Sequence, residues 1–188
     1  VDGASSPGIA CEALISGVWE EDEDLPVRRY YTSGGGSRTN FLIAQGNNGA
    51  TERETSLEFD GTTWNNSADM HWNCYASNTA GDASGAMTCG GYPTAGPTTE
   101  MAQYNGSAWD VESDMNNARY IHGCDGTKTN AIAYQVAPDA SAKENETYNG
   151  TSWTDIGVGG GGGTYSRGGA FASGTGDAAI CGFGKANG

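Results

Sequence analysis

Tryptophan recurs along this chain at a near-constant interval. Trp19, Trp64, Trp109 and Trp153 are separated by 45, 45 and 44 residues. Three of them end closely related segments, FDGTTW, YNGSAW and YNGTSW, and the first ends a diverged version, LISGVW. A fixed period of this length indicates that one supersecondary unit is repeated along the chain. The residues that recur with it are therefore expected to pack the scaffold rather than to bind a ligand, and they are Trp19, Trp64, Trp109, Trp153, Tyr104, Tyr148, Gly90 and Gly91.

Each unit predicts four short antiparallel strands. An extended i, i+3, i+4 apolar pattern is missing, and Gly and Asn interrupt every apolar run, which favours strands joined by turns. The Asn149-Gly150 pair predicts a type I′ hairpin turn, because that turn needs positive φ at both central residues. In the third unit the expected strands are 119–124, 129–136, 144–148 and 151–156, with a tight turn at 125–128 and a loop at 137–143.

Four strands in each repeat of this length are typical of a β-propeller blade, so the predicted fold is an all-β, single-domain propeller over residues 1–188. The last unit lacks its own tryptophan hairpin, and the chain begins with a Trp19 segment that has no inner strands before it. We therefore expect four blades, closed by the N-terminal strand completing the last blade; the alternative is a slice of a larger propeller or array. The blade units are 22–66, 67–111, 112–156, and 157–188 together with 10–20.

Composition argues against nucleic-acid and membrane partners and leaves the state of the cysteines open. The formal net charge is −14, which repels phosphate backbones and argues against nucleic-acid binding. An apolar run of 18 residues is absent, so membrane insertion is not expected. The five cysteines form no C-x-x-C pair; we expect small buried residues in strands, with one or two disulfides left open.

The repeat also resembles a known family. The repeat is similar to the kelch-type repeat, and the resemblance is carried by the order M-x-x-A-R, G-x-G-T-x-T, a Gly-Gly pair and E-x-x-Y-N-G-T-S-W. More narrowly, it resembles the Gly/Thr-rich kelch-like repeats of structural and fibre proteins of marine bacteriophages. Two departures from the pattern occur: Tyr134-Gln135 replaces Gly-Gly in the third unit, and the Gly-Gly pair is only partial in the first and last units. The matching segments are Met115–Arg119, Gly126–Thr129 and Glu146–Trp153 in the third unit, and Gly90-Gly91, Glu100 and Tyr104–Trp109 in the second.

This resemblance implies a non-enzymatic virion protein, a capsid or tail decoration or an appendage module, present in many copies outside the cell and contacting other virion proteins. The alternative is a carbohydrate-binding adhesin that recognises a host-surface glycan. Some kelch-type propellers are metal oxidases, a remote alternative here because the two histidines, His71 and His122, fall at different positions of the unit.

Propeller topology places the variable segments on one face: 20–24, 47–53, 92–98, 137–143 and 157–163. Binding residues concentrate in such loops on rigid scaffolds. Trp72 is outside the tryptophan register, and Trp72, Tyr92 and His71 are our candidate ligand or partner contacts. For Trp72 the alternative is packing against the neighbouring blade.

Catalytic residues are not predicted, because the chain has no G-x-S-x-G element and no paired carboxylates at a repeat-breaking position. Cofactors are likewise not expected.

Within the acidic run 20–24, Asp22 and Asp24 are weak calcium candidates, and a solvated acidic edge is the alternative. The sequons at Asn65, Asn105, Asn145 and Asn149 are interpreted as turn residues.

Overall fold

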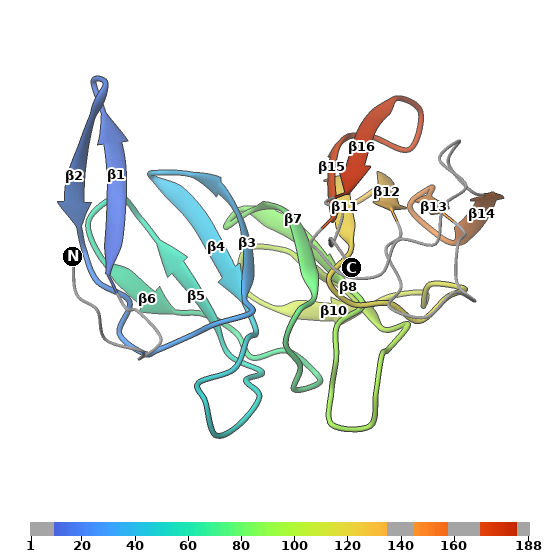
Figure 1. Cartoon of the computed structure of the whole chain (residues 1–188), viewed down its shortest axis with the longest axis horizontal. Helices are drawn as coiled ribbons and strands as arrows, with labels where there is room; N and C mark the ends of the chain where they lie inside the picture. Colours follow the sequence, from blue (N-terminus) through green and yellow to red (C-terminus); the bar gives the residue numbers. More distant parts are fainter. Residues whose placement is uncertain (1–9, 135–144, 158–169, 184–188) are drawn as a thin grey trace, which may run out of the picture.

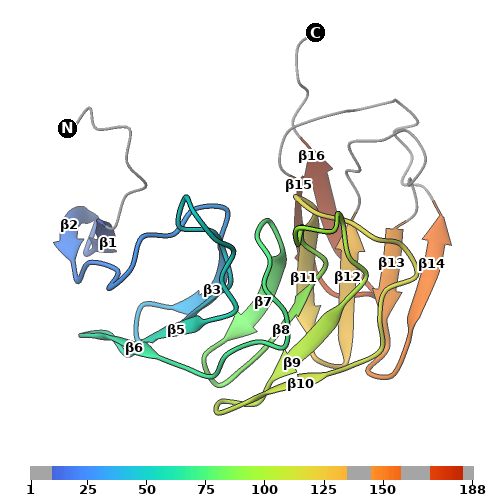
Figure 2. The same cartoon turned by 90° about the horizontal axis from the view of Figure 1, so that it is seen from below.

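The computed structural model describes residues 10–134, 145–157 and 170–183. These residues form antiparallel sheets and contain no helix, so none of them offers a helix that could cross a bilayer. Three sheets have four strands each, and two further sheets are two-stranded hairpins. Figures 1 and 2 show the sheets side by side along an arc.

The three complete sheets have the strand order of propeller blades, each strand pairing with the next along the chain. The first blade is β3 (Ser33–Ser37), β4 (Asn40–Ala44), β5 (Ser56–Phe59) and β6 (Trp64–Asn66). The second is β7 (Asn78–Asp82), β8 (Gly85–Cys89), β9 (Met101–Tyr104) and β10 (Trp109–Val111). The third is β11 (Gly123–Thr127), β12 (Asn130–Tyr134), β13 (Asn145–Tyr148) and β14 (Trp153–Gly157).

Two hairpins occupy the ends of the arc (Figure 1). They are β1 (Cys11–Ile15) with β2 (Val18–Asp22), and β15 (Ala170–Gly174) with β16 (Ala179–Phe183). The innermost strands β3, β7, β11 and β15 are neighbours in that order. The all-β, blade-like architecture agrees with the sequence prediction, whereas the predicted pairing of the N-terminal strand with the last blade is not present among the described strands.

The β1–β2 hairpin is held beside the first blade. Asp22 accepts a hydrogen bond from Arg38 Nε at 2.9 Å, and the Trp64 indole donates to the Glu23 carbonyl, also at 2.9 Å. These contacts keep the hairpin at the far end of the arc from β16. Trp19 is 65% exposed as a result, so the expectation that all four repeat tryptophans pack the scaffold is wrong for Trp19.

Each interface between complete blades has its own apolar core. Between the first and second blades, Leu42 and Ala44 pack against Tyr104 and Trp109, with Met70 beside them. Between the second and third blades, the same repeat positions supply Met115, Tyr148 and Trp153 around the strands of the second blade. Full burial of one such large side chain contributes about 1.5–3 kcal/mol, so the blades are held together chiefly by these layers.

In the third unit, the second and third predicted strands are confirmed within the described residues, and the fourth is confirmed but begins at Trp153. The first is displaced, because β11 spans Gly123–Thr127 instead of 119–124, and the predicted tight turn at 125–128 is therefore wrong: the turn lies at 128–129. Ile121 has a positive φ of 50°, which breaks the extended conformation between Arg119 and β11. The predicted type I′ turn is also wrong. Asn149 does not have positive φ; its side chain instead accepts hydrogen bonds from the amides of Thr151 and Ser152, both at 2.9 Å. Asp60 and Asn105 cap the equivalent turns in the same way.

Candidate functional site

Five tyrosines form a continuous aromatic row across the complete blades. Their ring centroids follow one another at 5.3 Å, 5.7 Å, 5.6 Å and 4.7 Å. Adjacent aromatic rings at such separations interact favourably in tilted and edge-on arrangements. We call this the tyrosine row; in spatial order its members are Tyr30, Tyr31, Tyr75, Tyr92 and Tyr120.

The repeat positions the row. Tyr30, Tyr75 and Tyr120 recur at intervals of 45 residues, each three residues before the first residue of an innermost strand. The residue after each of them has positive φ: 52° at Tyr31, 58° at Ala76 and 50° at Ile121. This conformation is uncommon for non-glycine residues and persists where the surrounding structure enforces it.

Hydrogen bonds between blades enforce that backbone. The Ala76 amide donates to the Tyr31 carbonyl at 2.8 Å, and the Ile121 amide donates to the Ala76 carbonyl at 2.9 Å. One residue from each complete blade is thereby joined to the next in a chain of backbone hydrogen bonds. The same residues hold the neighbouring tyrosines at a fixed spacing, so the row is set by the scaffold.

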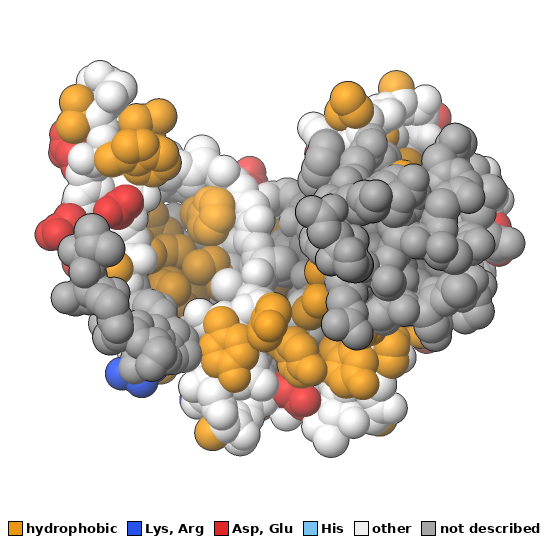
Figure 3. All heavy atoms as spheres, viewed as in Figure 1, with side chains coloured by type: hydrophobic (Ala, Val, Ile, Leu, Met, Phe, Trp, Pro, Cys, Tyr) orange, Lys and Arg blue, Asp and Glu red, His pale blue; other side chains and the backbone are white. Residues whose placement is uncertain are grey.

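Two of the predicted variable loops, 47–53 and 92–98, lie on this face, whereas residues 20–22 of the predicted segment 20–24 belong to strand β2. The Tyr30 and Asn47 backbones exchange two hydrogen bonds of 2.9 Å, and the Tyr92 amide donates to the Tyr75 carbonyl at 2.8 Å. The space-filling view shows hydrophobic side chains gathered across this part of the molecule, next to an acidic group (Figure 3). The row thus crosses the base of the two loops that follow β4 and β8.

Polar groups border the row. Glu52, in the loop of the first blade, accepts hydrogen bonds from Thr94 in the loop of the second blade, at 3.1 and 3.0 Å. The pKa of Tyr75 is raised because neighbouring groups desolvate it and because Tyr92 and Glu52 disfavour its phenolate. Tyr75 is therefore a neutral hydroxyl at physiological pH, able to donate and to accept hydrogen bonds.

The predicted site residues are only partly brought together. Tyr92 is in the tyrosine row. Trp72 is half-buried and packs against the core between the first and second blades, which fits the alternative of blade packing. His71 is exposed and its Nε2 lies 2.8 Å from the Trp109 carbonyl oxygen, so neither His71 nor Trp72 shares a ring contact with Tyr92 among the described residues.

The acidic run at the end of β2 borders an open groove beside the first blade. Asp22 is engaged by Arg38, and Asp22 and Asp24 line the groove with Glu21 and Glu23. Across the described ranges, no group of three His, Cys, Asp or Glu side chains could hold a metal ion. The predicted loops at 137–143 and 158–163 lie outside the described residues.

The remaining repeat residues serve the scaffold. The Trp109 indole donates to Ser56 Oγ of the first blade at 2.8 Å, and Tyr148 is stacked on Trp153 at 5.1 Å. Gly90 and Gly91 both have positive φ, and a Cβ on Gly91 would lie 2.5 Å from Cys74 Sγ. Only glycine fits that backbone and that space.

Sequence reasoning missed Tyr30, Tyr31, Tyr75 and Tyr120. A signal for three of them was present, because Tyr30, Tyr75 and Tyr120 share the period of the tryptophans. That period suggested scaffold packing, yet these side chains are half-buried and one of their neighbours, Tyr31, is 58% exposed. A repeated aromatic residue at a loop-facing position is thus a surface feature of every complete blade.

Comparison with known proteins gives a likeness of fold. No protein-family model matches the chain, and no curated protein matches its sequence. A solved structure of YjhT superposes on 78% of this chain with a TM-score of 0.60 at 14% sequence identity. The matched region spans 56% of the YjhT chain. The chain is therefore similar to YjhT in fold.

Proposed function

We propose that this protein is a non-enzymatic binding module that recognises a neutral glycan on its tyrosine row, as an appendage of a bacteriophage virion. The observation that supports this most is the unbroken run of five tyrosine rings across the complete blades. Flat aromatic faces with polar tips suit ligands that are apolar on one face and rich in hydroxyl groups, as sugars are.

The charge of the protein narrows the glycan class. A net charge of −14 repels anionic polymers, and Glu52 lies at the border of the row. A neutral polysaccharide is therefore favoured over a sialylated or sulfated one. The row is held by backbone hydrogen bonds between blades, so little conformational entropy is lost when a ligand binds.

Alanine substitution at the centre of the row tests this function. Tyr75 contacts the rings of both Tyr31 and Tyr92, so Tyr75→Ala divides the row. We expect this variant to lose at least tenfold in affinity for a neutral glycan found by array screening, while it still unfolds in one cooperative transition, at a lower denaturant concentration because two ring contacts are lost. Trp72→Phe is the matched control, because Trp72 packs on the core, and it should bind like the unsubstituted protein. An array on which only anionic glycans bind, or none, would refute the proposal.

A closed ring of four blades is the finer architecture that we propose. The two hairpins supply the strands of one blade, and both expose large apolar side chains: Leu14, Val18 and Trp19 on the first hairpin, and Ile180 on the second. Pairing of β1 with β16 would remove two open edges and bury these side chains. Small-angle scattering tests this: a ring closed within one chain gives a concentration-independent radius of gyration smaller than that of the arc in Figure 1.

The same exposed hairpins favour a second candidate function, structural decoration. If β1 and β16 pair with other virion subunits, many copies would occupy symmetric positions on the particle. Cross-linking of intact particles followed by mass spectrometry distinguishes structural decoration from the closed ring. Cross-links from residues 11–22 to another virion protein support decoration, and cross-links to residues 179–183 of the same chain support the closed ring.

A further inference from the structure

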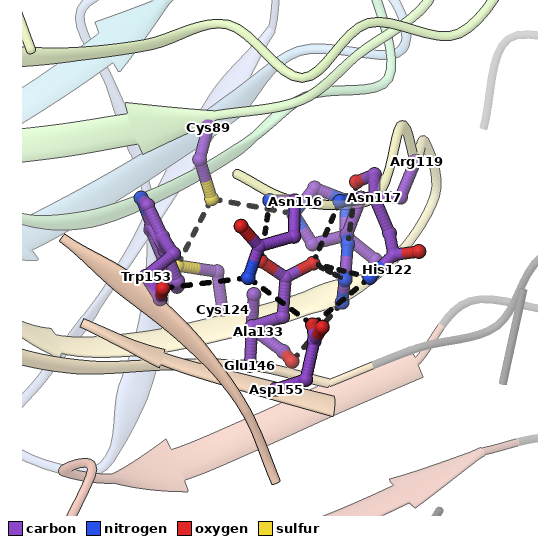
Figure 4. Close-up of polar contacts among 10 residues, drawn as sticks. All are labelled: Cys89, Asn116, Asn117, Arg119, His122, Cys124, Ala133, Glu146, Trp153 and Asp155. Carbon is purple, nitrogen blue, oxygen red and sulfur yellow. Dashed lines mark hydrogen bonds and ion pairs between the residues drawn. The ribbon is translucent and has the colours of Figure 1, made fainter. Parts of the chain in front are cut away.

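Two cysteines from neighbouring blades meet in the core between the second and third blades. Cys89 ends β8 and Cys124 lies in β11, and their Sγ atoms are 3.3 Å apart. Cys89 is fully buried and Cys124 is 6% exposed. His122 lies beside them, with its Nε2 atom 3.4 Å from Cys89 Sγ (Figure 4).

This pair breaks the repeat. One period earlier, at the interface between the first and second blades, the equivalent positions are Ala44 and Thr79. Packing at this position therefore does not require sulfur. The third cysteine of the described core, Cys74, instead contacts Gln45 Oε1 at 2.9 Å.

We propose that Cys89 and Cys124 form a reversible disulfide that cross-links the second and third blades when the protein meets a hydroperoxide. A disulfide needs the sulfur atoms at about 2.05 Å, so the pair must close by roughly 1.3 Å, which is within reach of side-chain rotation and small strand shifts. The cross-link would enclose a segment of 35 residues.

The surroundings assign the two thiols different roles. The sulfur–sulfur contact with Cys124, the charge of His122 and that of Arg119 lower the pKa of Cys89, against the desolvation that would raise it. The contact with Cys89 and burial raise the pKa of Cys124. The contact of His122 Nε2 with Cys89 Sγ at 3.4 Å places a base beside that thiol, so we assign Cys89 as the attacking thiolate and Cys124 as the resolving thiol. His122 is placed to accept the Cys89 proton, and its Nδ1 has no hydrogen-bond partner among the described side chains.

The chemistry balances with hydrogen peroxide as the oxidant. The Cys89 thiolate attacks one peroxide oxygen and the O–O bond breaks, which leaves a sulfenic acid and a hydroxide that takes the proton from His122. The Cys124 sulfur then attacks Cys89 Sγ, the S–O bond breaks, and the leaving hydroxide departs as water with the Cys124 proton. Two thiols lose two electrons in total, and one peroxide becomes two water molecules.

Peptide mapping of the full-length protein tests the proposal. The folded protein is treated with peroxide and then denatured, so that an alkylating reagent reaches every free thiol, the buried ones included. Cleavage with trypsin and an aspartate-specific protease then places Cys89 in peptide 82–109, Cys124 in 120–124 and Cys74 in 69–81. We expect peptides 82–109 and 120–124 to be joined, with a loss of two hydrogen atoms that a reductant reverses, and Cys74 to be alkylated. Alkylation of both Cys89 and Cys124, or oxygenation of Cys89 without a cross-link, would overturn the proposal.

Single substitutions test the order of attack. In Cys124→Ala, we expect peroxide to leave Cys89 as a sulfenic acid, because its resolving partner is gone; since Cys89 is buried, dimedone is added together with a denaturant to trap it. In Cys89→Ala, Cys124 should remain unlabelled; labelling of Cys124 instead of Cys89 would contradict the assigned roles. In the unsubstituted protein, the oxidised form should melt about 5–15 °C above the reduced form. Cys74→Ala is the matched control and should keep this difference.

Discussion

Arg119 and Glu146 form an ion pair in which neither side chain is exposed to solvent (Figure 4). Glu146 also accepts hydrogen bonds from the Asn116 amide at 2.7 Å and the Asn117 amide at 3.0 Å. Arg119 directly precedes Tyr120, so this pair fixes one end of the tyrosine row. The first blade has Leu57 at the position of Glu146, and its Arg29 donates instead to the Gln45 and Thr55 carbonyls at 2.9 and 2.6 Å.

Replacing Glu146 should destabilise the protein strongly. Glu146→Leu leaves the buried Arg119 charge without its carboxylate and two backbone amides without an acceptor, so we expect a loss of about 3–5 kcal/mol in the free energy of unfolding. Urea denaturation measures this. The double variant Arg119→Cys/Glu146→Ala reproduces the Cys74 and Ala102 pair of the second blade and should recover part of the loss. Equal stability of Glu146→Leu and the unsubstituted protein would show that the pair contributes nothing.

Two equivalent tyrosines should respond in opposite ways to removal of their hydroxyl group. The Tyr148 hydroxyl is buried without a hydrogen-bond partner among the described residues, whereas the Tyr104 hydroxyl bonds to Ser67 at 2.5 Å and to Glu58. Tyr148→Phe should be neutral or stabilising by up to about 1 kcal/mol, and Tyr104→Phe should cost about 1–2 kcal/mol. Thermal unfolding of both variants side by side checks this, and the opposite order would contradict it.

Stability should fall in alkaline solution. Desolvation raises the pKa of Tyr104, with a further contribution from Glu58, and desolvation also raises the pKa of Tyr148. A raised folded-state pKa stabilises the fold below the unfolded value of about 10, and that stability is lost as the pH rises through the folded value. Urea unfolding measured from about pH 8 to about pH 11 should show a falling free energy of unfolding. Tyr148→Phe should make this fall shallower. A flat profile would exclude the tyrosines as its source.

Gly91 should tolerate no side chain, unlike a second glycine of the same loop. Gly91 has φ of 114° and a Cβ there would lie 2.5 Å from Cys74 Sγ, whereas Gly96 has φ of 118° with no atom within 4 Å of an added Cβ. Gly96→Ala therefore measures the backbone strain alone, about 1 kcal/mol. Gly91→Ala adds a clash and should cost at least about 2–4 kcal/mol in the free energy of unfolding. Similar losses in both variants would mean that the core yields around Gly91.

The tryptophan period was sufficient to predict strands and blades, because each strand pairs with a neighbour only a few residues away along the chain. Tyr148 and Trp153, for example, face each other across one turn. Their pairing follows from local alternation and from Asn149, which caps the turn between them. The fold class and the buried tryptophans of the second and third blades were therefore accessible from sequence.

The tertiary structure alone decided how the blades meet. Tyr31 and Tyr75, like Cys89 and Cys124, belong to different blades, and their contacts depend on the angle between sheets. That angle results from many small packing contacts in the two interblade cores, which no periodicity encodes. The contacts of Arg38 with Asp22 and of Trp64 with Glu23 hold the β1–β2 hairpin at the far end of the arc from β16. Sequence by itself thus determined the repeated unit, while the packing between units decided the tyrosine row, the thiol pair and the open ends.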